Sequence, residues 1–426
     1  MDTKGTVLIR SEQLNVGIYV CLDLGWMDHP FTFSHFRIKN EEQLQQVRAL
    51  GLEKVRVDPS RSTSAPLSLK DVQQNPPPPP PPAASGPTEE VVAKRERMAK
   101  LKARKQAINN CEKKYLDAAK SVGSISRNLL ARPQETIAEA EALTEHLASS
   151  LLAEQEIAIH LMNDKMMGEE VYYHSLNISV LAMIMGRAMG LPETDLKMLG
   201  MGGIFHDVGK MKIPHKVLQN ADKPNKAEQD FIQLHVQYGY EIGQKVNLPL
   251  PVLRIISQHH EYIDGSGYPN RLKGDDIDSL SRILSVVNMY DNLCNPVHIA
   301  NALTPHEALS LMYAQQRKRF DGKVLGLLVH SMGVYPPGTI VRLNNEAIGM
   351  VMTVNITKPL KPHVMVYEEQ VPKEEAMILD LALEEDLSIS KAIRPSQLPT
   401  PVFEYLSPRS RVTYFFDAGN PPRGSR

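Results

Sequence analysis

Hydrophobic residues recur at intervals of three and four through the middle of the chain. Five stretches have this spacing: 176–191, 196–205, 227–246, 252–258 and 281–293. Residues spaced in this way lie on one face of an α-helix. The pattern therefore predicts an all-α helical domain over 169–332. A helical connector is predicted over 88–168, with Pro133 near a helix start.

The first part of the chain has a different pattern. Apolar residues alternate over 6–10 and 16–22, helical spacing follows over 41–50, and 54–57 again has the pattern of a strand. These segments predict a small α+β module within residues 1–75.

The last part of the chain is rich in β-branched residues and turn pairs. This composition is concentrated in 338–367 and predicts a β-rich appendage over 333–370. The segment 371–426 contains several prolines and is expected to be a poorly ordered tail. The sequence thus predicts a multi-domain protein.

A run of seven prolines, 76–82, separates the first module from the helical region. Such a run favours the extended polyproline II helix, which has no internal hydrogen bonds. It could be a docking site for a proline-recognition domain or a spacer. We interpret 76–87 as a linker because no other ligand motif accompanies it.

Composition excludes several classes of protein. The 426 residues carry a net charge of −1, which gives no overall field that favours nucleic acid or an anionic membrane. The three cysteines are too few and too widely spaced for a disulfide framework or a cysteine zinc site. The chain has no apolar run of membrane-spanning length and no signal-peptide pattern, so we expect a cytoplasmic protein without a membrane span.

The connector contains a basic segment, 94–114, with nine Lys or Arg against two Glu. A nucleic-acid or lipid patch is one interpretation. Aromatic residues for base stacking are missing, so we favour the solvated face of a helix and expect no nucleic-acid polymer as partner. The connector helices could pair two chains into an oligomer or merely pack against the core of the helical domain.

Histidines are concentrated in the helical domain, where six of the 14 lie between positions 174 and 260. One histidine on an apolar helix face is usually a core residue. Four separate helical sites are harder to explain in this way: Glu170 with His174, His206 with Asp207, His235, and His259 with His260. Imidazole and carboxylate together suit Fe, Mn or Zn. Two such metals can stabilise a phosphoryl displacement and activate water.

The motifs HDVGK at 206–210 and HHEYIDGSGYP at 259–269 resemble those of the HD-GYP family, within the HD superfamily of metal-dependent phosphohydrolases. The resemblance covers about 170–331. The module at 1–75 resembles the domain of unknown function that often precedes HD-GYP domains in bacterial proteins.

The resemblance implies an all-α HD-type catalytic bundle that hydrolyses cyclic di-GMP to pGpG and/or GMP. It implies two or three divalent metal ions, Fe or Mn, with Asp207 as a bridging ligand. Lys210 matches the lysine that contacts the scissile phosphate, and the family associates the GYP loop with diguanylate cyclases. The matched ligand positions are Glu170, His174, His206, Asp207, His235, His259 and His260.

The GYP loop has two interpretations. Tyr268 could stack on guanine, or it could pack the loop against the helices. We expect Asp264, Gly267, Tyr268 and Pro269 to shape or contact the substrate site.

Two departures from the family pattern concern metal and phosphate binding. Asn288 stands where the family has a metal-ligating aspartate, and its amide oxygen is a neutral, weaker ligand. Cations that grip the phosphates are missing from 294–299, and Arg282 or the segment 317–319 could replace them.

Three hypotheses follow. The first is a cyclic di-GMP phosphodiesterase that uses a metal-activated hydroxide. The second, suggested by Asn288, is a catalytically weak protein that binds cyclic di-GMP or docks to cyclases. The third is a hydrolase of another nucleotide, against which the intact GYP motif argues.

Overall fold

The computed structural model describes most of the chain and divides it into two compact units. The described residues are 5–24, 29, 31, 34–74, 89–153, 158–161, 170–219, 224–355, 358–369, 371, 373, 376–407 and 414–417. Met1–Ala103 and Glu368–Ala376 form the first unit, and Arg104–Tyr367 and Met377–Arg426 form the second. The predicted polyproline linker, 76–87, lies outside the described residues.

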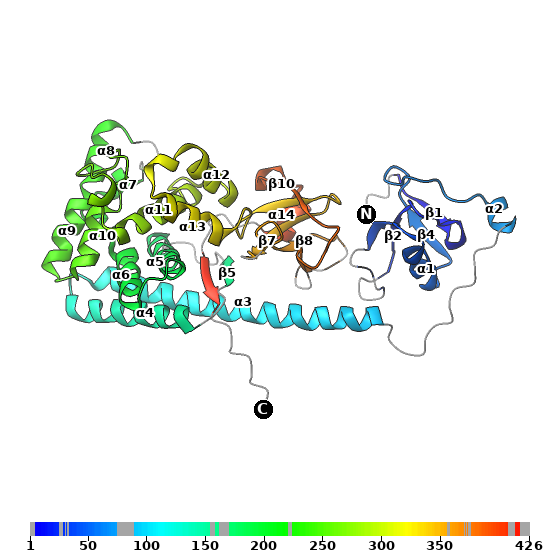
Figure 1. Cartoon of the computed structure of the whole chain (residues 1–426), viewed down its shortest axis with the longest axis horizontal. Coiled ribbons are helices and arrows are strands. Elements are labelled where there is room, and N and C mark those ends of the chain that lie inside the picture. Colours follow the sequence, from blue (N-terminus) through cyan, green and yellow to red (C-terminus); the bar gives the residue numbers. More distant parts are fainter. Residues whose placement is uncertain are drawn as a thin grey trace, which may run out of the picture. The chain divides into compact units, whose positions relative to one another are not determined.

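The first unit contains an antiparallel sheet in the order β1-β4-β2-β3, with helix α1 packed against it (Figure 1). Its elements are β1 (Val7–Arg10), β2 (Tyr19–Cys21), β3 (His35–Arg37), α1 (Glu41–Ala49), β4 (Lys54–Val57) and α2 (Leu69–Gln74). The alternating residues Ile9, Val20 and Val55 are buried against Leu44 and Val47 of α1. The predicted small α+β module is confirmed, and β3 is an additional strand.

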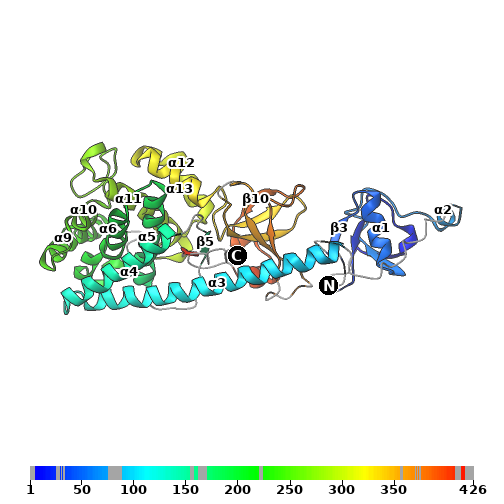
Figure 2. The same cartoon turned by 60° about the horizontal axis from the view of Figure 1, so that its bottom comes forward.

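Two long helices lead into the second unit. Helix α3 (Glu89–Asn128) continues from the first unit into the second, and α4 (Pro133–Ala153) begins at the predicted proline. The second half of α3 and α4 lie side by side (Figure 2), with the Ser124 hydroxyl donating to Glu139. Among the described helices, none combines the length and apolar character needed to cross a membrane.

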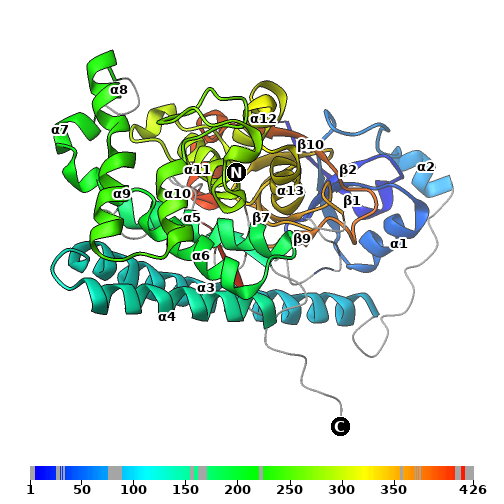
Figure 3. The ribbon, with the colours of Figure 1, turned by 60° about the vertical axis from the view of Figure 1, so that its left-hand side comes forward.

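A helical bundle forms most of the second unit, as predicted. Its helices are α5 (Glu170–Ala188), α6 (Glu193–Phe205), α7 (His215–Leu218), α8 (Lys226–Gln233), α9 (His235–Lys245), α10 (Leu250–Gln258), α11 (Ser279–Cys294), α12 (Pro305–Gln315) and α13 (Gly322–Met332). Helices α5, α6, α10 and α11 pack together (Figure 3). Gly203 of α6 lies so close to the backbone of Ser179 in α5 that a side chain would collide with it.

The C-terminal region differs from the prediction. A five-stranded antiparallel sheet has the order β10-β6-β7-β8-β9. Its strands are β6 (Ile340–Leu343), β7 (Ile348–Thr353), β8 (His363–Val366), β9 (Ile378–Asp380) and β10 (Ile389–Ile393), and α14 (Thr400–Leu406) follows. Strands β9 and β10 lie in the predicted tail, 371–426, and β10 pairs with the distant β6. The predicted appendage boundary at residue 370 is therefore wrong. The sheet extends beyond it because the short strands β9 and β10 pair with strands from earlier in the chain.

Candidate metal centre

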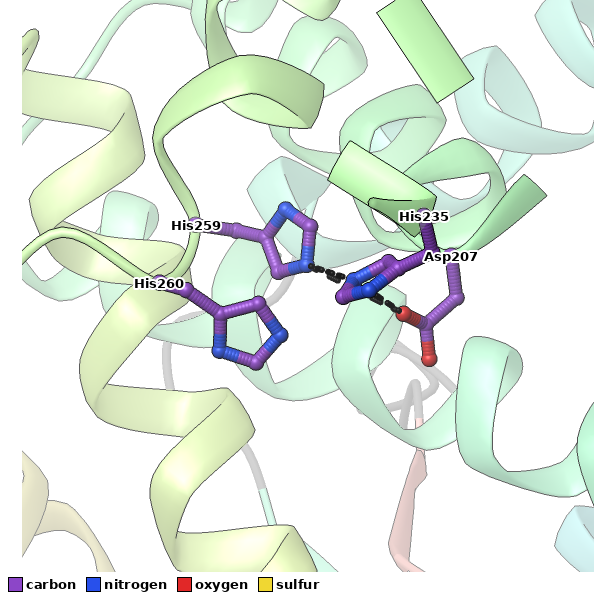
Figure 4. Close-up of side chains that lie close together, drawn as sticks. All are labelled: Asp207, His235, His259 and His260. Atoms are coloured by element: carbon purple, nitrogen blue, oxygen red, sulfur yellow. Dashed lines mark hydrogen bonds and ion pairs between the residues drawn. The ribbon is translucent and has the colours of Figure 1, made fainter. Parts of the chain in front are cut away.

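Two adjoining clusters of ligand side chains share one aspartate. Asp207, His235, His259 and His260 form the first cluster (Figure 4), and His174, His206 and Asp207 form the second. Within each cluster, the ligand atoms lie within 4.8 Å of one another. The structure thus brings together all the predicted histidine ligands around the carboxylate of Asp207.

Most of these ligands lie at helix ends. His206 caps the C-terminus of α6 and Asp207 follows it, His235 begins α9, and His259 caps the C-terminus of α10. The 3₁₀ helix η3 (Val208–Lys212), which comes directly after Asp207, packs against α9. This packing holds Asp207 beside His235.

Hydrogen bonds to one ring nitrogen define the tautomers of three histidines. Nδ1 of His206, His235 and His259 lies 2.8, 2.7 and 2.8 Å from the backbone carbonyl three residues earlier. A carbonyl oxygen only accepts, so Nδ1 carries the proton in each ring and Nε2 of the neutral ring keeps its lone pair.

The free nitrogens face one another inside the clusters. Nε2 of His235 lies 3.2 Å from Nε2 of His259, and the same atoms of His174 and His206 are also 3.2 Å apart. Oδ1 of Asp207 is buried without a hydrogen-bond donor. The neutral rings of His235 and His259 face each other with lone pairs and cannot hydrogen-bond to each other, whereas a cation between them would be coordinated by both nitrogens and by Oδ1 of Asp207. The donor set therefore fits divalent metal ions.

Burial sets the charge of the first cluster. It lowers the pKa of His235 to about 4 and the pKa values of His259 and His260 well below their usual range. Burial alone would raise the pKa of Asp207, but the charge of Lys210 and the hydrogen bond from His174 hold it well below its usual range. Neutral imidazoles and an ionised carboxylate are the forms that bind metals.

Lys210 is the charged group nearest to the shared aspartate. Its Nζ donates to Oδ2 of Asp207 at 2.6 Å, and 35% of its side chain is exposed. The predicted catalytic lysine therefore lies at the rim of the metal centre, where an arriving anion can reach it.

The GYP loop packs directly on a ligand. The Tyr268 ring stacks on His260, with ring centroids 4.5 Å apart and planes inclined by 19°. Gly267 is pressed against the backbone of His260 and Tyr262, which leaves no room for a side chain. Of the two interpretations of the loop, packing against the helices is present here.

Glu261 holds the GYP loop in place through hydrogen bonds. Its buried carboxylate accepts backbone hydrogen bonds from Asn270 at 2.6 Å and Leu272 at 3.0 Å. Glu261 is part of the motif at 259–269, but no role was predicted for it from the sequence. Its contacts show that it folds the loop over the histidines.

The other predicted substrate residues have structural contacts. Asp264 accepts from the backbone of Ser266 at 2.9 Å, and Pro269 is exposed. The Arg282 guanidinium pairs with Asp275 at 3.1 Å and Asp321 at 3.2 Å. The prediction that Arg282 binds phosphate thus finds no support in its contacts.

The basic 3₁₀ helix η6 (Arg317–Arg319) lies beside the GYP motif. The carbonyl of Arg319 accepts from the backbone of Ile263 at 2.9 Å, and its guanidinium lies 5.5 Å from the centre of the Tyr262 ring. Arg317 and Lys318 are exposed. Among the cations considered from the sequence as replacements, Arg317 and Lys318 are thus accessible to a substrate phosphate.

Comparison with known families accounts for most of the chain. Residues 143–324 match the HD domain, and the motifs 206–210 and 259–269 lie inside this match. The chain carries an HD domain. Residues 6–140 match a domain of unknown function, DUF3391, and residues 340–400 match the KOW domain associated with HD domains. The predicted resemblance to HD-GYP proteins with that N-terminal domain is confirmed.

Several curated proteins are similar in sequence to this chain. Cyclic di-GMP phosphodiesterase PA4108 of Pseudomonas aeruginosa is 27% identical over 358 residues, covering 83% of each chain. 3'3'-cGAMP-specific phosphodiesterase 2 of Vibrio cholerae is 36% identical over 142 residues, 33% of this chain and 27% of that protein. Cyclic di-GMP phosphodiesterase response regulator RpfG of Xanthomonas campestris is 32% identical over 154 residues, 36% and 41% of the two chains.

The HD match begins before the predicted catalytic region, 169–332. It includes part of α4, which was assigned to the connector, 88–168. Thr144 and Leu147 of α4 are buried, and Thr144 lies against Gly200 of α6. Helical periodicity does not distinguish a connector from a helix of the same core.

Two predicted ligands remain predictions. Glu170 is the first residue of α5, but its side chain is outside the described part of the structure. Asn288 is buried on α11, and its Oδ1 accepts from Asn292 at 2.9 Å. The amide group of Asn288 thus has an intrahelical partner.

The close contact between η3 and α9 makes Gly209 a sensitive position in the HD domain. A Cβ at Gly209 would collide with the backbone of His235 and Gly239. We expect Gly209→Ala to cost about 3 kcal/mol of stability through overpacking, and to weaken metal binding by displacing Asp207. Urea unfolding and metal titration measure both effects. Gly326→Ala, at an open helical position, is the control and should not destabilise the HD domain.

His174 predicts a pH dependence of metal binding. Burial alone would lower its pKa, but hydrogen bonds to Asp207 and Asp291 outweigh burial and raise it to about 9. Below that pH a metal must displace a proton, so affinity should rise between pH 6 and 9 by up to about tenfold per pH unit. Calorimetric Mn²⁺ titrations in buffers of different ionisation enthalpy count the released proton. A pH-independent affinity over this range would contradict the prediction.

Proposed function

We propose that this chain is a metal-dependent phosphodiesterase that hydrolyses cyclic di-GMP to pGpG and/or GMP. The observation that carries the proposal is the pair of ligand clusters joined by Asp207 inside the HD domain. It is supported by relatives named as cyclic di-GMP phosphodiesterases, one of them alignable over 83% of both chains.

Two clusters imply two metal ions, and Glu170 would add a third. His174, His206 and Asp207 would hold one ion, and Asp207 with His235, His259 and His260 the other. Imidazole and carboxylate ligands together suit Fe, Mn or Zn, and the resemblance to HD-GYP proteins favours Fe or Mn as the occupants. When bound, such ions polarise a phosphoryl oxygen and make water nucleophilic at neutral pH.

The remaining chemistry belongs to side chains at the rim. Lys210 would exchange part of its contact with Asp207 for a phosphate oxygen and stabilise the charge that develops there. Tyr268 would hold His260 in place through stacking and present its other face to a guanine base. Exposed Arg317 and Lys318 would attract the two phosphates of the substrate.

The alternative is a binding or cyclase-docking protein with weak turnover. Asn288 favours it, because a neutral amide replaces a carboxylate and already pairs with Asn292. If Asn288 limits catalysis, Asn288→Asp should increase metal affinity and turnover on the order of tenfold, since added ligand charge strengthens cation binding. Unchanged values in that variant would show that Asn288 is not limiting.

The deciding experiment is purification without oxygen, metal quantification, and turnover with added Mn²⁺ or Fe²⁺. Cyclic di-GMP and 3'3'-cGAMP serve as parallel substrates, because relatives with either name are similar to this chain. Metal-dependent release of pGpG or GMP supports the proposal. Binding of metal and cyclic di-GMP without hydrolysis supports the alternative, and preferential cleavage of 3'3'-cGAMP would overturn the substrate assignment.

Three further proposals follow from the sequence resemblance. They are a contact between the GYP loop and diguanylate cyclases, a cytoplasmic location, and possible oligomerisation through the connector helices. Co-purification with a cyclase and light scattering of the full chain test the first and the third.

A further inference from the structure

A strand from the end of the chain is buried in the second unit. Strand β11 (Tyr414–Asp417) pairs antiparallel with β5 (Ala158–Leu161), and β11 packs against α5. Tyr414, Phe415 and Phe416 are at most 3% exposed. The Tyr414 hydroxyl lies 2.9 Å from that of Tyr290 on α11. Strand β11 therefore contacts α5, which carries His174, and α11, which carries its partner Asp291.

A continuous set of hydrogen bonds joins this strand to a metal ligand. The backbone N–H of Tyr414 donates to Oδ1 of Asn177 at 2.8 Å. Nδ2 of Asn177 donates to Oδ1 of Asp291, and Oδ2 of Asp291 lies 2.6 Å from Nδ1 of His174. Asn177 and Asp291 are at most 1% exposed, so water does not replace these partners.

The strand determines which way the Asn177 amide faces. A backbone N–H only donates, so it requires the amide oxygen, and the amide nitrogen must then face Asp291. The reverse orientation would place the amide oxygen against a carboxylate and the amide nitrogen against an N–H. Tyr414 thus keeps the Asn177 amide nitrogen in place as a hydrogen-bond donor to Asp291.

Asp291 in turn controls the ring of His174. A carboxylate that accepts from Nδ1 orients the imidazole and leaves Nε2 for the metal. Asn295 also donates to Oδ1 of Asp291, at 2.8 Å. With both amides in place, Oδ2 is directed at His174, one helical turn before Asn177 on the same face of α5.

We propose that β11 positions the metal ligand His174 through Asn177 and Asp291, so that the C-terminal strand tunes one of the two metal positions. Asn177 is a positioning residue in this arrangement. The inference rests on the metal centre of the proposed function, but it does not depend on which nucleotide is hydrolysed.

The test is Mn²⁺ binding by the full chain carrying Asn177→Asp. This nearly isosteric change replaces the donor to Asp291 with a second carboxylate. We expect the affinity of the His174–His206–Asp207 position to fall about 10- to 100-fold, while the position with His235, His259 and His260 keeps its metal. At a free Mn²⁺ concentration that just fills both positions of the wild type, the variant should bind one ion per chain instead of two.

Ser179→Ala is the matched control. Ser179 is also buried on α5, and its hydroxyl donates to the Gly200 carbonyl at 2.9 Å, away from Asp291. This variant should lose stability and keep both metals. Equal metal loss in the two variants, or wild-type binding by Asn177→Asp, would overturn the inference.

Hydrogen exchange tests the strand itself, because coupling between two sites is reciprocal. Mn²⁺ should slow exchange in peptides covering 414–417 of the wild type and of Tyr414→Phe, which keeps the backbone donor. It should not do so in Asn177→Asp. If wild-type protein binds Mn²⁺ with this coupling but does not cleave cyclic di-GMP, the proposed function fails and the inference stands. If Mn²⁺ leaves exchange of the wild-type strand unchanged, the inference fails whatever the turnover.

Discussion

Asp207→Asn is expected to lower cyclic di-GMP turnover at least about a thousandfold and to empty both metal positions. Asp207 is the one residue shared by the two clusters, and its Oδ1 is buried without a donor. Asparagine keeps the shape but removes the charge that balances two cations. Loss of metal forfeits several kcal/mol of transition-state stabilisation, and each 1.36 kcal/mol is a factor of ten. Metal analysis and initial rates on the same preparation measure both losses.

Asp230→Asn is the control for this change. Asp230 is an exposed aspartate on α8, so its neutralisation should leave metal content and rate unaltered. Full turnover by Asp207→Asn would refute a bridging role for this aspartate. Retention of metal with loss of turnover would instead give Asp207 a role in the reaction but not in holding the ions.

Lys210→Ala should lower kcat about 100- to 1,000-fold and leave the metal content unchanged. Its ammonium lies 2.6 Å from Asp207 Oδ2 and is partly exposed, so it can reach a substrate oxygen while the aspartate keeps its ligand role. Removing one donor to developing negative charge typically costs this much in kcat. Lys210→Arg should recover part of the rate.

Lys212→Ala separates this effect from a general loss of positive charge. Lys212 lies two residues further along η3, and its ammonium pairs with Glu241 at 3.1 Å on the surface. We expect nearly wild-type kcat in this variant. A similar loss in both variants would assign the effect to electrostatic attraction of the substrate rather than to a contact of Lys210 in the transition state.

Periodicity was a good guide to single elements of this fold and a poor guide to their pairing. Apolar spacing predicted the bundle helices, but it joined α8 and α9 into one helix. The break at Leu234 has no glycine or proline to mark it, and η3, which packs against α9, comes from a distant part of the sequence pattern. Likewise β10 is short and irregular by itself, and it becomes a strand because β6 offers a partner.

The candidate metal ligands were predictable from the sequence where they lie in short local motifs. HDVGK and the paired histidines predicted the side chains that meet around Asp207 as candidate metal ligands. Asn177 gave only a weak signal, a polar residue three positions after His174 in an apolar helix, and its partner Tyr414 is far away in sequence. The ion pairs of Arg282 with Asp275 and Asp321 could not be predicted from the sequence for the same reason, and its role in phosphate binding stays a prediction.

The link between β11 and the metal centre has a consequence for biosynthesis. Asn177 and Tyr414 are 237 positions apart. At a synthesis rate of about 5–20 residues per second, the ribosome adds Tyr414 roughly 10–50 s after Asn177. The helical bundle has time to form before β11 has been synthesised. The hydrogen bond between Tyr414 and Asn177 then closes a very long loop. If β11 positions His174 as proposed, a nascent chain would form the position with His235, His259 and His260 first, and the position with His174 would reach its full affinity only after β11 has been synthesised.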